Sequence, residues 1–209
     1  MLSLGLFVRL EAKPGKENGV AAFLTQGLQM ANQEATTPLW FALRLGPSTF
    51  AVVDAFPDES GRQAHRNGPI PKALMAQAAD LLAVPPSIEK TDVLGAKVAQ
   101  HLKQKLDTLS LGLFVRLEAK PGKENEVAAF LGQALQMANQ EATTPLWLTL
   151  RLGPSTFAVF DVFADESGRQ AHLNGPIAQA LMANAPSLFA VPPVIDKTEV
   201  VGAKISPEV

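Results

Sequence analysis

The sequence predicts an α+β fold built from two tandem ferredoxin-like units, each with the element order β-α-β-β-α-β. The first observation is a repeat: residues 2–98 recur without a gap as residues 109–205, displaced by 107 positions, with 20 differences among 97 aligned pairs. The second is that the hydrophobic spacing in each copy changes between period 2 and period 3.6, which is typical of strands that alternate with helices. We therefore expect two domains, residues 1–98 and 109–209, joined by a connector at residues 99–108.

The beginning of each copy is predicted to be a strand followed by an amphipathic helix. The strand pattern is the alternation of two sets of residues, Leu4, Leu6, Val8 and Leu10 with Ser3, Gly5, Phe7, Arg9 and Glu11, and Lys13-Pro14-Gly15 ends it. From Lys16 the spacing becomes i, i+3, i+4, i+7, which predicts a helix with one apolar face. That face consists of Val20, Phe23, Leu24, Gly27, Leu28 and Ala31.

Two further strands, residues 38–45 and 49–56, are predicted to form a hairpin, because Gly46-Pro47-Ser48 favours a turn between them. A three-residue loop makes positions 41 and 53 direct cross-strand neighbours. One face of the hairpin is then wholly apolar: Leu39, Phe41, Leu43, Ala51, Val53 and Ala55. The other face is mixed, which is the usual lining of a small-molecule pocket. It carries Trp40, Ala42, Arg44, Phe50, Val52, Asp54 and Phe56.

The differences between the copies support this register. Phe41 and Val53 of the first copy are Leu148 and Phe160 in the second. The larger side chain is thus on the first strand of the hairpin in one copy and on the second strand in the other, while the summed volume stays similar. Such an exchange is expected of two side chains that touch. It therefore favours the pairing of position 41 with position 53.

The rest of each copy is predicted to hold a short helix, a longer helical segment and a last strand. The acids Asp58 and Glu59 begin the short helix, where they complement the helix dipole, and Asn67-Gly68-Pro69 breaks it. The longer segment spans residues 70–82, and after Pro85-Pro86 the strand 88–98 closes the unit.

The connector, residues 99–108, is polar with Leu102 and Leu106 in helical spacing, which predicts a short helix of about 15 Å, the length of a strap between two packed units. A four-stranded sheet with helices on one face must bury its other face, and the second copy can supply that surface within the same chain. We therefore expect an intramolecular pseudo-dimer, and further self-association stays open.

Composition excludes several classes of function. The chain is 47% hydrophobic and 18% charged with a net charge of −2, so it has no basic stripe for nucleic acid. It has no cysteine, which excludes disulfides, thiolate metal ligation and a thiol nucleophile. No membrane span and no signal peptide are expected, so we expect a cytoplasmic protein. A Gly-rich phosphate loop, a nucleophile elbow and a metal-binding triad are all missing from the sequence.

The mixed face of the hairpin supplies the first candidate site residues. An indole, a guanidinium and a carboxylate could together orient a planar, partly anionic ligand. The alternative is a structural ion pair beside a core tryptophan. Arg9 could join this group, or it could be a solvated charge at the sheet edge. The candidate substrate-binding residues in the two copies are Trp40, Trp147, Arg44, Arg151, Phe50, Phe157, Phe56 and Phe163.

Histidine supplies the second candidate. His65 and His172 are the histidines within the repeats, and imidazole suits proton transfer near neutral pH. The alternative is a packing or capping residue at a helix end. His101, in the connector, is expected at the surface. We expect no metal site.

Two stretches, FVRLEAKPGKENEVAAFL and RLGPSTFAVFDVFADESGRQAHLNGP, resemble the antibiotic biosynthesis monooxygenase (ABM) domains of the dimeric α+β barrel superfamily. The resemblance covers both copies, which makes the chain similar to a tandem fusion of two such domains. It is most specific in the order of an acid (Asp54, Asp161), an aromatic two residues later, an Asp-Glu helix start and an Ala-His pair. It implies two units packed as a pseudo-dimeric α+β barrel, with a pocket between sheet and helices in each unit.

Some members of this family are monooxygenases that use neither metal nor flavin and act on polyphenolic or quinol-type substrates. The resemblance thus implies no cofactor, a small aromatic molecule and O2 as partners, and His65, His172, Asp54 and Asp161 as catalytic residues. The chain departs from the family in having no tyrosine, and in having Ile70 where several relatives carry a second histidine. Met75 stands where heme-degrading relatives carry their ligand, which disfavours heme degradation. A non-catalytic small-molecule binder or structural protein of the same fold remains the alternative.

Overall fold

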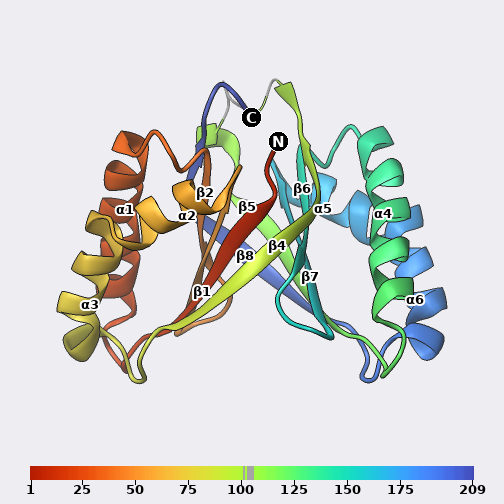
Figure 1. Ribbon diagram of the computed structural model, residues 1–209, viewed down its shortest axis with the longest axis horizontal. Coiled ribbons are helices and arrows are strands. Elements are labelled where there is room, and N and C mark those ends of the chain that lie inside the picture. The colour runs from red at the N-terminus through yellow and green to blue at the C-terminus, as the bar shows by residue number, and fades with distance from the viewer. Residues whose placement is uncertain (101, 103–105) are drawn as a thin grey trace. The chain divides into compact units, whose positions relative to one another are not determined.

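The computed structural model describes residues 1–100, 102 and 106–209 (Figure 1). By its contacts the chain divides into two compact units. The first unit consists of Met1–Thr91 with Thr198–Val209, and the second unit is Asp92–Lys197. The units therefore differ from the sequence copies, because each one includes a segment from the end of the other copy.

The elements of the two copies follow the same order, and those predicted from the first copy are present; where the sequence predicted an end, it differs by at most one residue, and α1, whose end was not predicted, ends at Gln33. The first copy holds β1 (Leu4–Glu11), α1 (Glu17–Gln33), β2 (Leu39–Arg44), β3 (Thr49–Phe56), α2 (Glu59–Arg66), α3 (Pro69–Leu81) and β4 (Ser87–Val98). The second copy holds β5 (Leu111–Glu118), α4 (Glu124–Gln140), β6 (Leu146–Arg151), β7 (Thr156–Phe163), α5 (Glu166–Leu173), α6 (Pro176–Leu188) and β8 (Val194–Ile205).

Local chemistry explains where these elements begin and end. Gly15 lies in the turn between β1 and α1. Its φ is 80°, a backbone conformation that residues with a side chain rarely adopt. Asp58 caps α2, since its Oδ1 accepts a hydrogen bond of 2.9 Å from the Gly61 amide. The acids at Asp58 and Glu59 are thus helix-start residues, as predicted.

The β2–β3 hairpin has the predicted register. Phe41 pairs with Val53 and Trp40 with Asp54, and in the second copy Leu148 pairs with Phe160. The apolar face is completely buried at Leu39, Phe41, Leu43, Ala51, Val53 and Ala55. The mixed face packs its own core in the first unit, which includes Trp40, Phe50, Phe23, Leu24 and residues of α3.

The last strand of each copy extends beyond its own copy's unit. In the first unit, β8 pairs with β2 from Leu39–Ile205 to Arg44–Glu199. In the second unit, β4 pairs with β6 from Asp92–Arg151 to Val98–Leu146. The hydrogen-bonded strand order is β1-β3-β2-β8-β5-β7-β6-β4 and closes on itself among the described residues, which confirms the predicted barrel class. We expected β4 to complete the unit of its own copy. This was wrong for the half of β4 from Asp92 onward, which pairs with β6 in the second unit.

Helices cover one face of the sheet in each unit. In the first unit α1 lies beside α3, and in the second α4 lies beside α6 (Figure 1). Of the predicted connector helix, residues 101 and 103–105 lie outside the described residues, including the predicted surface position of His101. The described part contains a 3-10 turn, Leu106–Thr108.

We expect Gly5→Ala to destabilise the fold. A Cβ at Gly5 would lie 2.5 Å from Thr91 Oγ1 and 2.7 Å from the Asp54 carbonyl oxygen, and the second of these is backbone that cannot rotate away. Overpacking of this kind costs about 1–3 kcal/mol, measurable by urea unfolding. Gly132→Ala is the control, because a Cβ there meets nothing within 4 Å and the exposed helix should gain stability. Equal effects of the two substitutions would contradict the close approach of β1 to its neighbours.

Candidate functional site

An apolar cavity of about 230 Å³ lies in the first unit, between the mixed face of the sheet and helices α1, α2 and α3. We call it the first pocket. Its polar lining residues are Asp54, His65 and Arg66. Its other walls are apolar: Leu6, Val8, Leu10, Phe23, Leu24, Trp40, Val52, Ile70, Pro71, Leu74, Met75 and Ile88.

A buried histidine between two acids forms the polar end of this pocket. His65 Nε2 lies 3.1 Å from Asp54 Oδ2, and His65 Nδ1 lies 2.6 Å from Glu34 Oε2. Thr37 Oγ1 donates a 2.7 Å hydrogen bond to the same Glu34 oxygen. Asp54 is wholly buried and the His65 side chain is 5% exposed. We call Asp54, His65 and Glu34 the acid-histidine-acid cluster.

The two acids decide the protonation of the histidine. Burial alone would lower the pKa of His65, but the hydrogen bonds and charges of Asp54 and Glu34 outweigh it and raise this pKa to about 9. Burial raises the pKa of Asp54 above its ordinary value in spite of the hydrogen bond with His65. Burial also acts to raise the pKa of Glu34, but His65 and Thr37 hold it below its ordinary value. At neutral pH the cluster therefore holds an imidazolium.

Glu34 is itself held by a lysine from the end of the chain. Lys204, on the part of β8 that belongs to the first unit, donates hydrogen bonds of 2.5 and 2.6 Å to the carbonyls of Ala31 and Glu34 at the end of α1. Its ammonium complements the helix C-terminus, where carbonyls lack helical partners. Its charge also helps to lower the pKa of Glu34. A residue of the second sequence copy thus supports the site of the first unit.

Trp40, one of the residues that line the first pocket, carries an unused donor. Its indole Nε1 is buried and has no hydrogen-bond partner among the described residues. Trp147 has the same property in the second unit. A buried N–H without a partner is costly, so this donor is suited to an oxygen acceptor on a ligand.

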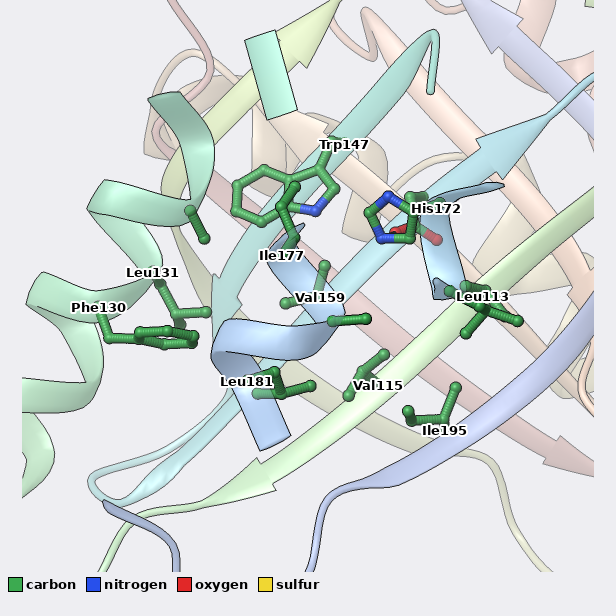
Figure 2. Close-up of a pocket in the computed structure, with 14 residues that line it drawn as sticks. Leu113, Val115, Phe130, Leu131, Trp147, Val159, His172, Ile177, Leu181 and Ile195 are labelled. Atoms are coloured by element: carbon green, nitrogen blue, oxygen red, sulfur yellow. The ribbon is translucent and has the colours of Figure 1, made fainter. Parts of the chain in front are cut away.

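The second unit repeats the cluster around a much smaller cavity of about 30 Å³, the second pocket (Figure 2). His172 lies 2.6 Å from Glu141 Oε2 and 3.1 Å from Asp161 Oδ2, and its pKa is raised to about 10 by these acids against the effect of burial. Figure 2 shows His172 and Trp147 at the same end of the pocket, with Leu181, Val115 and Ile195 toward the other. A space of this size holds about two water molecules.

The structure brings together only some of the residues predicted from sequence. Trp40, Asp54 and His65 line the first pocket, as Trp147, Asp161 and His172 line the second. Phe56 contacts the His65 ring at 5.5 Å between centroids, without lining the pocket. The same holds for Phe163 and His172.

The predicted roles of arginine and of a second phenylalanine do not match the geometry. Arg44 lies outside the pocket lining, with its guanidinium 5.2 Å from the centre of the Phe50 ring and bonded to the Pro47 carbonyl. Arg151 and Phe157 repeat this arrangement in the second unit. The reason is that both lie at the turn end of the hairpin, far along the strand from Asp54. Arg9 also does not join, because Leu6, Val8 and Leu10 are the β1 residues that line the pocket, and Arg9 pairs with Glu11 instead.

Glu34 and Lys204 are site residues that the sequence analysis did not identify. Glu34 follows the last residue of α1 and lies 31 positions before His65, so no local spacing joins them. One signal was available: residues 28–40 are identical to residues 135–147 in the second copy, although the flanking positions 27 and 41 differ from their counterparts. No such signal marks Lys204. It reaches α1 only because the end of β8 pairs with β2 in the first unit, while the end of β4 pairs with β6 in the second, an arrangement that we call the exchange of strand ends.

Comparison with known proteins identifies the fold. No family model and no curated protein matches the sequence. The chain is similar in structure to a proposed monooxygenase from Fusobacterium nucleatum, with a TM-score of 0.86 at 15% identity, covering 98% of this chain and 94% of the other. It is also similar to a ferredoxin-fold protein related to antibiotic biosynthesis monooxygenases from Listeria monocytogenes, with a TM-score of 0.55 at 10% identity over 96% and 95% of the two chains.

A third structure is similar to one part of the chain. It is a protein of unknown function from Nitrosomonas europaea, 61% identical over 47% of this chain and 95% of its own length, with a TM-score of 0.46.

None of the helices in the described part of the chain has the length and apolar character needed to cross a membrane.

The raised pKa values predict that stability falls at alkaline pH. The folded protein binds the histidine proton more tightly than the unfolded chain, whose histidine pKa is the ordinary 6.5. The stabilisation is therefore complete below about pH 6.5 and is lost as pH rises through about 9 for His65 and about 10 for His172. Since one pKa unit is about 1.4 kcal/mol, the shifts set an upper bound of about 3 kcal/mol for His65 and about 5 kcal/mol for His172.

Urea unfolding between pH 6.5 and pH 10 measures this effect, with the double variant His65→Asn/His172→Asn as the comparison. We expect the wild-type chain to lose more stability over this range than the double variant. Equal losses would show that the acids do not hold the histidines protonated.

We expect Lys204→Met to destabilise the first unit by about 1–3 kcal/mol, because it leaves the Ala31 and Glu34 carbonyls without their donor. Thermal and urea unfolding would measure the loss. Lys72→Met is the control, since Lys72 is exposed on α3 and should tolerate the change. Similar stability of the two variants would refute the structural role of Lys204.

Proposed function

We propose that the chain is a cofactor-independent monooxygenase of the antibiotic biosynthesis monooxygenase family that acts on a quinol-type or polyphenolic small molecule. The observation that carries this proposal is the first pocket, where an apolar cavity of about 230 Å³ ends at a buried acid, a buried imidazolium and an unused indole N–H. The similarity in fold to a proposed monooxygenase and to an ABM-related protein supports the same class.

The pocket suits a substrate whose own anion reduces O2. An aromatic ring would lie among Leu6, Val8 and Leu24, excluded from water, with its hydroxyl directed at the polar end. There the substrate needs a proton acceptor and a donor that stabilises the resulting oxyanion. We assign the role of donor to Trp40 Nε1, a buried N–H without a partner among the described residues, on a side chain that lines the pocket.

Asp54 is the proton acceptor in this proposal, and His65 positions it. Both ring nitrogens of His65 already face acids, Nε2 toward Asp54 and Nδ1 toward Glu34, and the high pKa keeps the ring protonated at neutral pH. A histidine in this state is a poor base. The Asp54 carboxyl has a raised pKa, which brings it closer to the pKa of a phenol and makes proton transfer more favourable.

The substrate supplies all the electrons that O2 accepts, so the reaction needs no other reductant. For an anthrone, the enolate gives one electron to O2, and the resulting radicals combine to form a carbon–oxygen bond and a peroxide. The peroxide loses water and leaves a carbonyl. One oxygen atom stays in the product, and the other leaves as water with the enol proton and the hydrogen of the reacting carbon. The protein's part is to hold the anion in a dry, oriented position.

Oxygen uptake tests the proposal. With anthrones and hydroquinones as substrates and no added metal, heme or flavin, we expect the chain to consume O2. Asp54→Asn should lower the rate about 10²- to 10⁴-fold, the usual effect of removing a general base, and Trp40→Phe should lower it by removing the indole donor. The matched control is Asp80→Asn, because the Asp80 side chain is 77% exposed in a surface ion pair.

The outcome that refutes the proposal is the absence of turnover across the substrate panel, or an Asp54→Asn variant as active as the control. Asp161→Asn distinguishes the two units. Since the second pocket has room for about two waters, we expect this substitution to lower the rate by less than half. The alternative function, a non-catalytic binder or structural domain, is favoured for the second unit by this small cavity.

A further inference from the structure

The mouth of the first pocket carries one charged side chain. Three of the lining residues are exposed, Arg66, Met75 and Ile88, and we define the mouth by them. Arg66 is the last residue of α2, directly after His65, and it forms no ion pair with an acid of the described chain. A guanidinium at the rim of an apolar cavity is available to a ligand that enters it.

The second pocket lacks this charge. Leu173 occupies the position of Arg66 and lines the pocket, and Gln179 replaces Lys72 next to the pocket residue Ala178. The duplicated chain therefore contains two versions of one site, which differ by two positive charges near the mouth. The acid-histidine-acid cluster and the tryptophan are the same in both.

The second pocket is also smaller, and one substitution contributes to this. Ala134 lines it, whereas the first unit has Gly27 at the same position. A Cβ at Gly27 would lie 3.4 Å from Trp40 Cζ2, so the alanine methyl takes up space against the indole. The volumes agree with this effect, since the pocket of the unit with Gly27 measures about 230 Å³ and the pocket of the unit with Ala134 about 30 Å³.

We propose that Arg66 makes the first pocket selective for an aromatic ligand with a carboxylate at the end opposite its hydroxyl, and that the second pocket does not bind such an anion. This inference rests on the proposed function for the direction of the hydroxyl, toward Asp54 and Trp40. The binding itself needs no catalysis.

The charges in the pocket decide which way this ligand enters. A carboxylate at the inner end would face the buried Asp54 and would lose its hydration in an apolar cavity. At the mouth it stays in water and can accept two parallel hydrogen bonds from the Arg66 guanidinium. The cavity of about 230 Å³ is smaller than the roughly 300–1,000 Å³ of pockets for drug-sized ligands, which indicates a ligand smaller than a typical drug molecule.

Isothermal titration calorimetry of the full chain tests the inference with a matched pair of probes, 6-hydroxy-2-naphthoate and the neutral 2-naphthol. We expect one naphthoate per chain, and about tenfold weaker naphthoate binding in Arg66→Leu, as expected for the loss of a charge-assisted hydrogen bond. Binding of 2-naphthol should stay within about twofold, which also shows that the variant is folded. The substitution copies a residue that the second unit already tolerates.

Lys72→Gln is the control, because it removes a nearby charge that does not line the pocket. It should change naphthoate binding by less than about twofold at 0.15 M salt, where distant exposed charges are screened. Three results would overturn the inference: no naphthoate binding, equal weakening of both probes by Arg66→Leu, or two equivalent naphthoate sites per chain. Charge-selective binding without oxygen uptake would refute only the proposed function, whereas oxygen uptake without charge selectivity would refute only this inference.

Discussion

The antiparallel pairing of β2 with β3 is the constraint on which the rest of each unit depends. Side chains alternate between the two faces of a strand, so a register in which Trp40 is opposite Asp54 and Phe41 opposite Val53 assigns every neighbouring residue to one face. A slip by one residue would exchange the faces and expose the apolar one. The pairing thus directs Trp40, Val52 and Asp54 together into the space below the helices, where the pocket forms.

Within that space, the side chains that stabilise the buried charges are also the candidate site residues. A fully buried carboxylate is costly unless it is paired, and His65 pairs with Asp54 on one side and with Glu34 on the other. The arrangement explains why the imidazole is protonated, which is the reason that Asp54, rather than His65, is the proton acceptor in the proposed function. It also shows that a histidine at a helix end can be both a packing residue, against Phe56, and a member of the site.

The exchange of strand ends makes each site depend on both sequence copies. Lys204 belongs to the second copy but bonds the end of α1 in the first unit, and Lys97 of the first copy bonds the Ala138 and Glu141 carbonyls in the second unit. Duplication then allowed the pockets to change separately, since the supports of the cluster are common to both while Arg66, Pro71 and Gly27 differ from their counterparts. The units keep one scaffold and present two different mouths.

The sequence by itself determined the elements, the hairpin register and the candidates Trp40, Asp54 and His65. Hydrophobic periodicity and turn residues are local features of the chain, and the comparison of the two copies identified a pair of neighbours in one hairpin. Only the tertiary structure decided that Arg44 lies away from the pocket, that Glu34 holds His65, and that Lys204 supports Glu34. The contacts of Glu34 with His65 and Lys204 join residues far apart in the chain, and the pairing of β8 with β2 that brings Lys204 to α1 leaves no local pattern. The unequal cavities likewise depend on how whole side chains pack, which spacing alone does not show.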